Sequence, residues 1–476
     1  MHVGGAWVES ESGARTESTS PATGEAIGNV PEGTRDDARR AIQAANAAWR
    51  DWAARSAFER AHALERVAEL VAERRDELAR TLTLDQGKPL YGEAYDEVDE
   101  LLEYWRMAAA DATRLEGLMP PSVDANKRVL VYRVPRGVVG VITPWNWPYT
   151  MPAEILAPAL AAGNAVVWAP AASTSVCAVK LAECIVDAEL PAGVFNLVTG
   201  PGRVVGDEIV ASAGTHAIGF IGSTATGYRI AERAAGKALL LEMGGNGPVV
   251  VLDDADLDAA AEGTVTASFL CAGQSCTAGE LFLVQQEVHD EFVARVAARV
   301  ADGIRLGDPF EETTTMGPLN NESTAAKMDE HVGDAVERGA ALVAGGSRAA
   351  GFPTSLYYEP TVLDRVSAEM EVAREETFGP IVPIQTIRSE DEALAVIDAS
   401  PYGLLAAVFT RDLRRGLRFA EAARAGWVNV NASSNYWESH LPFGGRSGSR
   451  SGIGRVGGRF SLETLTELKT VVVELG

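Results

Sequence analysis

The chain has 476 residues, of which 46% are hydrophobic and 23% charged, with a formal net charge of −24 at pH 7 and a pI near 4.7. This length predicts two or three domains, and the ordinary composition excludes a disordered or fibrous protein. The negative charge argues against nucleic acid and anionic membrane as partners, and no run of about 18 apolar residues predicts a membrane span.

Four cysteines are present, Cys177, Cys184, Cys271 and Cys276. They are too few for a disulfide framework, and their spacing does not fit a zinc site, so we predict free thiols and no metal. The N-terminus lacks a basic region followed by an apolar core, which is the pattern of a signal peptide. These features predict a cytoplasmic protein.

The first part of the chain predicts amphipathic helices. One helix opens at Thr34, because Asp36 and Asp37 follow in its first turn. A second helix is expected at about 54–83 and a third at about 93–115, with a break between them at a Lys-Pro step.

From Arg128 onward, strands alternate with helices. The predicted strands are 129–134, 137–143, 165–168, 194–198 and 217–221, and the predicted helices between them are 151–162, 174–188 and 204–212. Alternation at this spacing predicts a parallel sheet covered on both faces, with a ligand at the carboxyl ends of its strands. The alternation restarts near residue 247 and continues to about 442, which predicts a second α/β domain. Residues 446–458 are expected to form a loop, and 466–473 a strand that pairs with another strand, in this chain or across a subunit boundary.

One stretch, residues 268–279, places Cys276 after a Gly-Gln-Ser turn in an otherwise apolar segment. A backbone poor in Cβ atoms can bring amide groups close to a thiol or to its substrate, which is typical of a nucleophile. A small buried side chain is the alternative, since free cysteine is among the most buried residue types.

Two further patterns are consistent with a chemical role. A strand followed by Gly222, Ser223 and, after one helical turn, Gly227 suits a diphosphate at a helix N-terminus, although such turns are common in α/β proteins. Glu242 ends a run of leucines, where burial would raise its pKa toward the range of a general base. A glutamate that reaches solvent or pairs with a lysine is an equally good interpretation.

Six motifs in register over nearly the whole chain resemble the aldehyde dehydrogenase superfamily. They are Thr143-Pro144-Trp145-Asn146-Trp147-Pro148, Gly222-Ser223-Thr224 with Gly227, Leu241-Glu242-Met243-Gly244-Gly245, Gly273-Gln274-Ser275-Cys276, Glu376-Thr377-Phe378-Gly379-Pro380 and Pro442-Phe443-Gly444-Gly445. The resemblance implies an α/β fold with two doubly wound parallel-sheet domains and a small β oligomerisation extension. It assigns 1–121 and 136–245 to a dinucleotide-binding domain, 246–443 to a catalytic domain, and 122–135 with 459–476 to the extension, and it implies a homodimer or homotetramer.

The resemblance also implies roles for individual residues. Cys276 would attack the aldehyde carbon, Asn146 would stabilise the oxyanion together with the Cys276 backbone N–H, and Glu242 would activate water to hydrolyse the thioester. The residues implied in cofactor binding are Trp145, Gly222, Ser223, Gly227, Glu376 and Phe378.

The chain departs from the family at the adenosine end of the cofactor site. Where the family usually has a lysine and a glutamate for the ribose, this chain has Ala169 and Ala172. The change removes hydrogen bonds to the ribose, but it also removes the carboxylate that would repel a 2′-phosphate, and the hydroxyls of Ser173, Thr174 and Ser175 are candidates to receive one. We expect NAD as the cofactor, with NADP as the alternative.

A second departure concerns the substrate. Trp147, Tyr149, Met151 and Phe443 predict an apolar or aromatic funnel for a neutral aliphatic or aromatic aldehyde. Glu154 stands where relatives that oxidise acid semialdehydes often have an arginine. If Glu154 faces the pocket, substrates should be neutral, hydroxylated or cationic; a solvent-facing glutamate is the alternative.

Three functions are therefore weighed. A hydrolytic dehydrogenase fits best, because coenzyme A-acylating relatives commonly lack the glutamate that matches Glu242. A catalytically silent binding protein on the same fold is the third reading, favoured by Ala169 and Ala172 but opposed by the intact Cys276 and Asn146.

Overall fold

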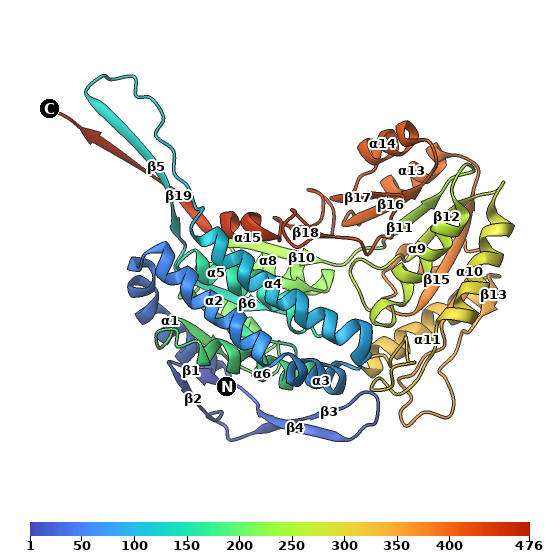
Figure 1. The fold of residues 1–476 in the computed structure, drawn as a ribbon, viewed down its shortest axis with the longest axis horizontal. Coiled ribbons are helices and arrows are strands. Elements are labelled where there is room, and N and C mark those ends of the chain that lie inside the picture. Colours follow the sequence, from blue (N-terminus) through green and yellow to red (C-terminus); the bar gives the residue numbers. More distant parts are fainter.

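The computed structural model describes residues 1–476, which form two α/β domains and a projecting two-stranded arm (Figure 1). The first domain is built on an eight-stranded sheet of order β18-β10-β9-β6-β7-β8-β1-β2. Its strands are β1 (His2–Val3), β2 (Ala6–Trp7), β6 (Val138–Ile142), β7 (Ala165–Ala169), β8 (Phe195–Leu197), β9 (Ala217–Gly222), β10 (Ala238–Met243) and β18 (Gly452–Ile453). The five central strands are parallel, and the short strands β1, β2 and β18 are antiparallel additions at the two edges.

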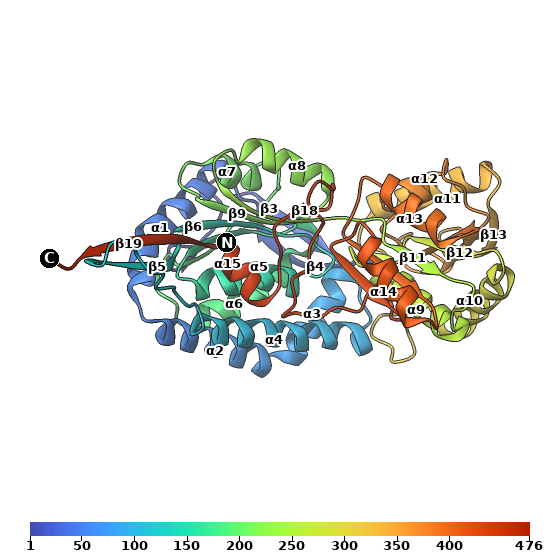
Figure 2. The ribbon, with the colours of Figure 1, turned by 90° about the horizontal axis from the view of Figure 1, so that it is seen from above.

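Helices cover both faces of this sheet, and Figure 2 shows α7 and α8 on the side opposite to α2 and α4. The helices of the domain are α1 (Arg35–Ala54), α2 (Ala57–Glu73), α3 (Arg75–Gln86), α4 (Tyr95–Ala112), α5 (Thr150–Ala161), α6 (Ser175–Asp187), α7 (Val205–Ala211), α8 (Thr224–Arg233) and α15 (Gly458–Thr464), with the short turns η1 (Leu90–Ala94) and η2 (Ala172–Thr174).

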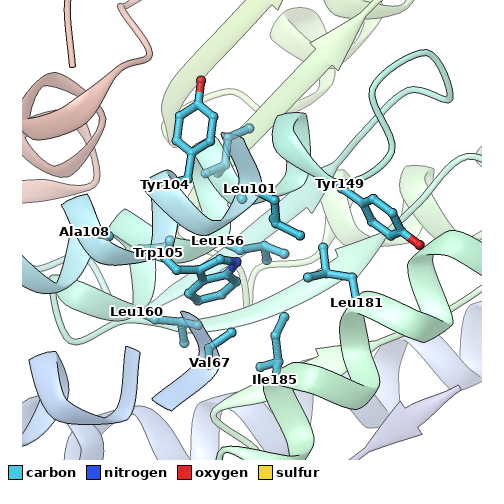
Figure 3. Close-up of a cluster of buried hydrophobic side chains, with 14 of the residues drawn as sticks. Val67, Leu101, Tyr104, Trp105, Ala108, Tyr149, Leu156, Leu160, Leu181 and Ile185 are labelled. Atoms are coloured by element: carbon cyan, nitrogen blue, oxygen red, sulfur yellow. The ribbon is translucent and has the colours of Figure 1, made fainter. Parts of the chain in front are cut away.

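Alternate residues of the buried strands face two separate cores, as the period of a strand requires. Along β7, Val166 and Trp168 join the core beneath α2 to α6, whereas Val167 joins the core beneath α1, α7 and α8. Figure 3 shows part of the larger core, where Trp105 of α4 lies among apolar side chains of α2, α5 and α6. Burial on both faces explains why these strands read as continuous apolar runs.

The second domain repeats the design on a seven-stranded sheet of order β13-β14-β15-β12-β11-β16-β17. Its strands are β11 (Pro248–Val251), β12 (Leu281–Gln285), β13 (Ala341–Ala344), β14 (Thr361–Asp364), β15 (Ile381–Ile387), β16 (Leu405–Phe409) and β17 (Trp427–Val430). Its helices are α9 (Leu257–Phe269), α10 (His289–Gly303), α11 (Glu322–Glu337), α12 (Glu371–Arg374), α13 (Glu390–Ala399) and α14 (Leu413–Ala422), with the turn η3 (Leu270–Gly273). All pairs are parallel except β13 with β14.

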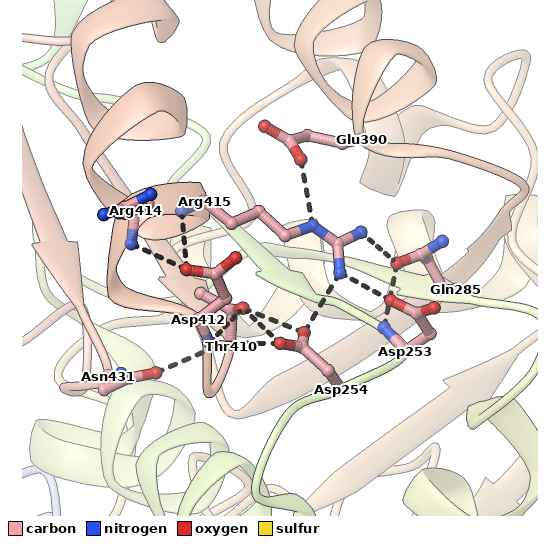
Figure 4. Close-up of polar contacts among 9 residues, drawn as sticks. All are labelled: Asp253, Asp254, Gln285, Glu390, Thr410, Asp412, Arg414, Arg415 and Asn431. Carbon is pink, nitrogen blue, oxygen red and sulfur yellow. Dashed lines mark hydrogen bonds and ion pairs between the residues drawn. The ribbon is translucent and has the colours of Figure 1, made fainter.

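A charge network joins α14 to the strand ends of this second sheet (Figure 4). The guanidinium of Arg415 lies within 3.0 Å of carboxylate oxygens of Asp253, Asp254 and Glu390, and it also donates to Gln285. Because one half-buried cation binds carboxylates from two segments and an amide from a third, the network fixes how α13 and α14 pack on the sheet.

The arm consists of β5 (Lys127–Pro135) and β19 (Thr466–Glu474), which pair antiparallel over their full lengths. It projects away from both domains and carries the C-terminus at its tip (Figure 1). The predicted terminal strand thus pairs within its own chain. A separate hairpin, β3 (Arg15–Thr19) with β4 (Ala26–Pro31), lies along the first domain.

The predicted fold class is confirmed, and three local predictions are corrected. The helix expected at 54–83 is two helices, because Arg74 has φ −105° and ψ 15° and ends α2. The loop expected at 446–458 contains β18, which pairs with β10. The segment 459–476, which the resemblance assigned to the extension, includes most of α15, and Leu462 of α15 packs in the core of the first domain. Within this segment, β19 is the part that belongs to the arm. No helix combines the length and the apolar character needed to span a membrane.

Candidate active site

Two cavities meet where the two sheets face each other, and they share the side chains of Met151, Glu242 and Cys276. The first, which we call the α4 cavity, measures about 300 Å³ and is lined by Lys88, Gly92, Glu93, Asp96, Glu97, Glu100, Trp147, Thr150, Glu154, Leu270, Ser275, Thr277, Asn435, Trp437 and Phe443 in addition to the shared residues. The second, which we call the β9 cavity, measures about 330 Å³ and is lined by Pro144, Trp145, Asn146, Ile221, Gly222, Ser223, Met243, Gly244, Ser323, Thr324, Lys327, Glu376, Thr377 and Phe378. The thiol therefore has access from two sides.

A left-handed turn between α9 and Cys276 positions the thiol. Cys271, Ala272 and Gly273 have φ values of 53°, 52° and 72°. A Cβ at Gly273 would lie 2.0 Å from the carbonyl oxygen of Gly379, so only glycine fits there. The Gln274 side chain holds the turn, since its Nε2 donates to the Cys271 carbonyl at 2.8 Å. The turn that precedes Cys276 is thus held in one conformation by packing and hydrogen bonds.

Asn146 lies against this turn. Its Nδ2 donates to the backbone carbonyl of Gln274 at 3.0 Å, which orients the amide toward the β9 cavity beside Cys276. The second hydrogen of the amide remains available to a ligand oxygen. The geometry is that of a neutral donor held next to a thiol, which can stabilise an oxyanion.

Glu242 lies near the end of β10 and is buried, with 4% of its surface exposed. Its Oε1 atom has no hydrogen-bond partner in the protein. Burial, reinforced by the charge of Glu154, raises the pKa of Glu242 well above its usual value. Burial also raises the pKa of the Cys276 thiol, as do the charges of Glu242 and Glu154. Burial disfavours the charged form of each group, and both line the space where the two cavities meet, so a proton can pass between them.

The β9 cavity brings together Trp145, Gly222, Ser223, Glu376 and Phe378, five of the six residues predicted for a cofactor. The helix α8 begins directly after Ser223, and no side chain caps its first N–H groups. Such a helix end suits a diphosphate. This donor set fits a dinucleotide.

Gly227 is the sixth predicted cofactor residue, and the structure places it elsewhere. It lies within α8 and does not line the β9 cavity. A Cβ at this position would lie 2.0 Å from the sulfur of Met243 on β10. Gly227 therefore allows the helix to approach the sheet and does not contact a diphosphate.

Glu376 and Phe378 sit on a turn that two features of the fold hold in place. The Glu376 carboxylate accepts from the Gly245 N–H at 3.2 Å, and a Cβ at Gly244 would lie 2.3 Å from it. Phe378 has a φ of 62°, and its ring meets Trp145 edge-on at a centroid distance of 5.7 Å. Gly244 is thus needed for the close approach of Glu376.

Glu280 lies beneath this turn, and no motif or local pattern predicted a role for it. Glu280 is buried, and its carboxylate accepts from the backbone N–H groups of Thr377 and Phe378 at 2.5 Å and 2.8 Å. Burial raises the pKa of Glu280 to about 8. Glu280 lies 97 residues or more from the groups it binds, so only the folded structure reveals the contact.

The segment after β7 is less open to a phosphate than its three hydroxyls predicted. Ser175 donates its hydroxyl to the Ala172 carbonyl at 2.8 Å, and Thr174 is 1% exposed. Only Ser173 remains partly exposed, next to the exposed Ala172. Ala169 is buried in the core beneath α1, α7 and α8.

The α4 cavity contains four of the five predicted substrate residues, Trp147, Met151, Glu154 and Phe443. Glu154 therefore faces the cavity and not solvent. Tyr149 does not line it. Figure 3 shows Tyr149 at the edge of the apolar core, where its hydroxyl donates to the Leu78 carbonyl at 3.1 Å, so the predicted substrate contact of Tyr149 is wrong.

The α4 cavity is acidic as well as aromatic, whereas the sequence predicted only an apolar or aromatic funnel. Carboxylates from η1 and α4 line one wall, and Glu154 of α5 lies on another. Lys88 is the one cation of the lining, and it is engaged by the buried Glu97 at 2.6 Å, with its ammonium 3.5 Å from the centre of the Trp147 ring. The helical spacing of the carboxylates could have revealed this wall.

Comparison with known proteins agrees with the geometry. The Aldehyde dehydrogenase family matches residues 7–471. A 3-sulfolactaldehyde dehydrogenase of Pseudomonas putida is 40% identical, over 98% of this chain and 96% of that protein, and an NADP(+) succinate-semialdehyde dehydrogenase of Escherichia coli is 38% identical, over 99% and 97%. The solved structure of betaine aldehyde dehydrogenase from Staphylococcus aureus in complex with NAD+ is 32% identical, and the match covers 100% of this chain and 94% of that chain, with a TM-score of 0.96.

The chain therefore belongs to the aldehyde dehydrogenase family. It is an NAD(P)-dependent enzyme that oxidises an aldehyde to a carboxylic acid. This finding excludes the hypothesis of a catalytically silent binding protein on the same fold.

The contact made by Glu280 generates a prediction. Glu280→Gln replaces one acceptor oxygen with an NH₂ group facing a backbone N–H, so the turn that carries Glu376 and Phe378 should shift. We expect the Kd for NAD to rise about tenfold, measured by quenching of tryptophan fluorescence. The exposed Glu287→Gln is the matched control. An unchanged Kd in a folded Glu280→Gln protein would contradict this positioning role.

Proposed function

We propose that the enzyme is a hydrolytic aldehyde dehydrogenase in which Cys276 is the nucleophile, Asn146 the oxyanion donor and Glu242 the general base. The observation that carries the proposal is the free Oε1 of Glu242, a buried acceptor in the space shared by the thiol and both cavities. Buried carboxylate oxygens are normally hydrogen-bonded, so an unpartnered one beside a nucleophile indicates a place for water or a proton.

In the first step the Cys276 sulfur bonds to the aldehyde carbon as its proton passes to Glu242. The carbonyl oxygen gains negative charge and is stabilised by the Asn146 amide and the Cys276 backbone N–H, each worth about 3 kcal/mol in comparable sites. The structure supports this step because the Gln274 carbonyl already orients the amide, so little reorganisation is needed.

The cofactor residues then serve the oxidation. When bound, the nicotinamide accepts a hydride from the former aldehyde carbon, which leaves a thioester on Cys276. Glu376 would hold the nicotinamide ribose, Phe378 and Trp145 would pack beside the ring, and Ser223 with Gly222 would meet the diphosphate at the start of α8.

Hydrolysis completes the reaction. After the proton taken from Cys276 has left to solvent, Glu242 takes a proton from a water molecule whose oxygen bonds to the thioester carbon. The C–S bond then breaks, the sulfur regains a proton from Glu242, and the carboxylic acid leaves. The coenzyme A-acylating alternative needs no such base. The buried position of Glu242 beside Cys276 therefore favours water as the acceptor of the acyl group.

For the cofactor, we propose that the enzyme accepts NAD and also NADP. Ala172 presents no carboxylate to a 2′-phosphate, and Ser173 remains partly exposed beside it. A third cavity of about 360 Å³ between α7 and α8 is lined by Arg203, Arg229 and Arg233, of which Arg233 pairs with Asp207 in the same lining, and the remaining positive charge suits a phosphate. We further propose a cytoplasmic location, since the four cysteines are free and the mechanism requires a reduced Cys276.

The catalytic proposal predicts that Cys276→Ala folds normally and loses activity by a factor of about 10⁴ or more, because the covalent step disappears. The measurement is absorbance of the reduced nicotinamide, with thermal melting to check the fold. Cys184→Ala, which changes a buried thiol of α6 away from both cavities, is the matched control and should remain active. A Cys276→Ala enzyme that keeps most of its rate would refute the assignment.

We also propose that the arm assembles the chain into a homodimer or homotetramer. Its two faces both carry exposed apolar residues, with Val472 opposite Val129 on one face and Val471 opposite Leu130 on the other. A two-stranded ribbon that is apolar on both sides is not stable alone in water. A partner subunit would cover it.

A single charge on the arm tests this assembly. Val472→Asp places a carboxylate on an apolar face, so we expect the native oligomer to dissociate into monomers, measured by size-exclusion chromatography with light scattering. Leu413→Asp, at an exposed site of α14 in the other domain, is the matched control. A native protein that is already monomeric would contradict the proposed role of the arm.

A further inference from the structure

The α4 cavity has a wall of four carboxylates, and Lys88 is the only cation in its lining. Glu93, Asp96, Glu97 and Glu100 follow each other at helical spacings of three and four residues, which places them on one side of η1 and α4. Of these, only Glu97 has a cationic partner, Lys88. The cavity is therefore strongly acidic although it contains the route to the thiol.

Glu154 extends this negative wall to the neighbourhood of the thiol. It projects from α5, lines the same cavity as Glu100 and Cys276, and accepts from the Tyr104 hydroxyl at 2.5 Å. Its charge also contributes to the raised pKa of the Cys276 thiol in that cavity. A substrate held at Cys276 would have its remote end among these carboxylates.

Aromatic rings form the other side of the cavity. Trp437 lies 5.8 Å from Phe443 and 6.2 Å from Tyr104, measured between ring centroids. The faces of such rings attract cations, as Lys88 already shows by lying over Trp147. Carboxylates combined with aromatic rings are the recognition chemistry of an ammonium group.

Building on the proposed function, we propose that the substrate is an aldehyde with a positively charged nitrogen at the end remote from its carbonyl, and that Glu154 and Glu100 bind this nitrogen. An aldehyde with a remote carboxylate would meet the same wall and be repelled. The expectation from the sequence, a neutral, hydroxylated or cationic substrate if Glu154 faces the pocket, is thereby narrowed to a cationic substrate.

The protonation of the wall supports this inference. Burial raises the pKa of Glu93 to about 7, that of Glu100 to about 8 and that of Glu154 to about 7. A bound cation favours the ionised form of each carboxyl group, so cation binding and ionisation strengthen each other. The ratio of kcat/KM for a cationic to a neutral aldehyde should therefore increase as the pH rises from about 6 to about 9. The other titratable groups that face the cavity are Asp96, Glu97, Lys88 and Glu242.

The test compares three aldehydes that differ in remote charge. 4-(Trimethylammonio)butanal carries a permanent cation and cannot cyclise, 5,5-dimethylhexanal is its neutral carbon isostere, and succinate semialdehyde is anionic. We expect kcat/KM for the cation to exceed that for the neutral isostere by at least about thirtyfold, and the anion to be the poorest. Equal values for cation and isostere, or a preference for the anion, would overturn the inference.

Variants identify the residues responsible. Glu154→Gln and Glu100→Gln should each lower the cation-to-neutral ratio of kcat/KM about tenfold, and thermal melting checks that each variant folds. Glu103→Gln, on the exposed side of α4, is the matched control and should leave the ratio unchanged. If both cavity variants keep the native ratio, the assignment of Glu154 and Glu100 is refuted.

The outcomes also separate this inference from the proposed function. If Cys276-dependent oxidation is found with the isostere but the cation has no advantage, the catalytic proposal holds and the substrate inference fails. If none of the three aldehydes is oxidised, binding of 4-(trimethylammonio)butanoate, the carboxylate product, is measured by calorimetry. Binding that Glu154→Gln weakens supports the inference without catalysis, and no binding refutes it.

Discussion

The site depends on a left-handed turn that the chain would not adopt by itself. Cys271 and Ala272 both have positive φ, which costs roughly 1 kcal/mol or more for each such residue, and contacts from distant segments must hold them. Cys271 is held at both ends: its N–H donates to the Glu93 carboxylate, and its sulfur accepts from the Gln86 side chain. The backbone N–H of Asn320 donates to the Gln274 side chain. The turn is therefore tied to both domains, and the thiol is positioned only when the domains are correctly packed.

The same contacts connect the turn to the carboxylate wall. Glu93 uses one oxygen to hold Cys271, and its other oxygen has no partner in the protein. Glu242 also has one buried oxygen without a partner, in the lining that it shares with Cys276. Unpaired buried acceptors oppose folding, so their accumulation around one cavity indicates that stability has been given up for binding and proton transfer. A cation and a water molecule are the ligands that would satisfy them.

Local sequence patterns predicted much of this structure. Thr34 opens α1 with the expected cap, since it accepts from the Asp37 N–H and Asp37 accepts in return. The apolar runs became the buried strands of two parallel sheets because both of their faces are covered. The motifs also led to Cys276, Glu242 and Asn146, and the structure places all three around the junction of the cavities.

The errors arise where distant parts of the chain decide the outcome. Tyr149 was expected to contact substrate, but the helix α5 turns its ring into the core, where a carbonyl of α3 receives its hydroxyl. Gly227 was expected at a phosphate, but it is needed for packing against Met243. The role of Glu280 could not be predicted at all, because its partners are backbone groups almost a hundred residues away. Each case depends on tertiary contacts, which sequence spacing does not contain.

The central claim is that Cys276 carries the acyl group and Glu242 releases it, and mass spectrometry of Glu242→Gln mixed with aldehyde and NAD tests it most directly. The account predicts one equivalent of reduced cofactor per site and a protein heavier by one acyl group, located on the peptide that contains Cys276. Steady turnover at the native rate with no acylated protein would contradict it, as would an acyl group on a different residue.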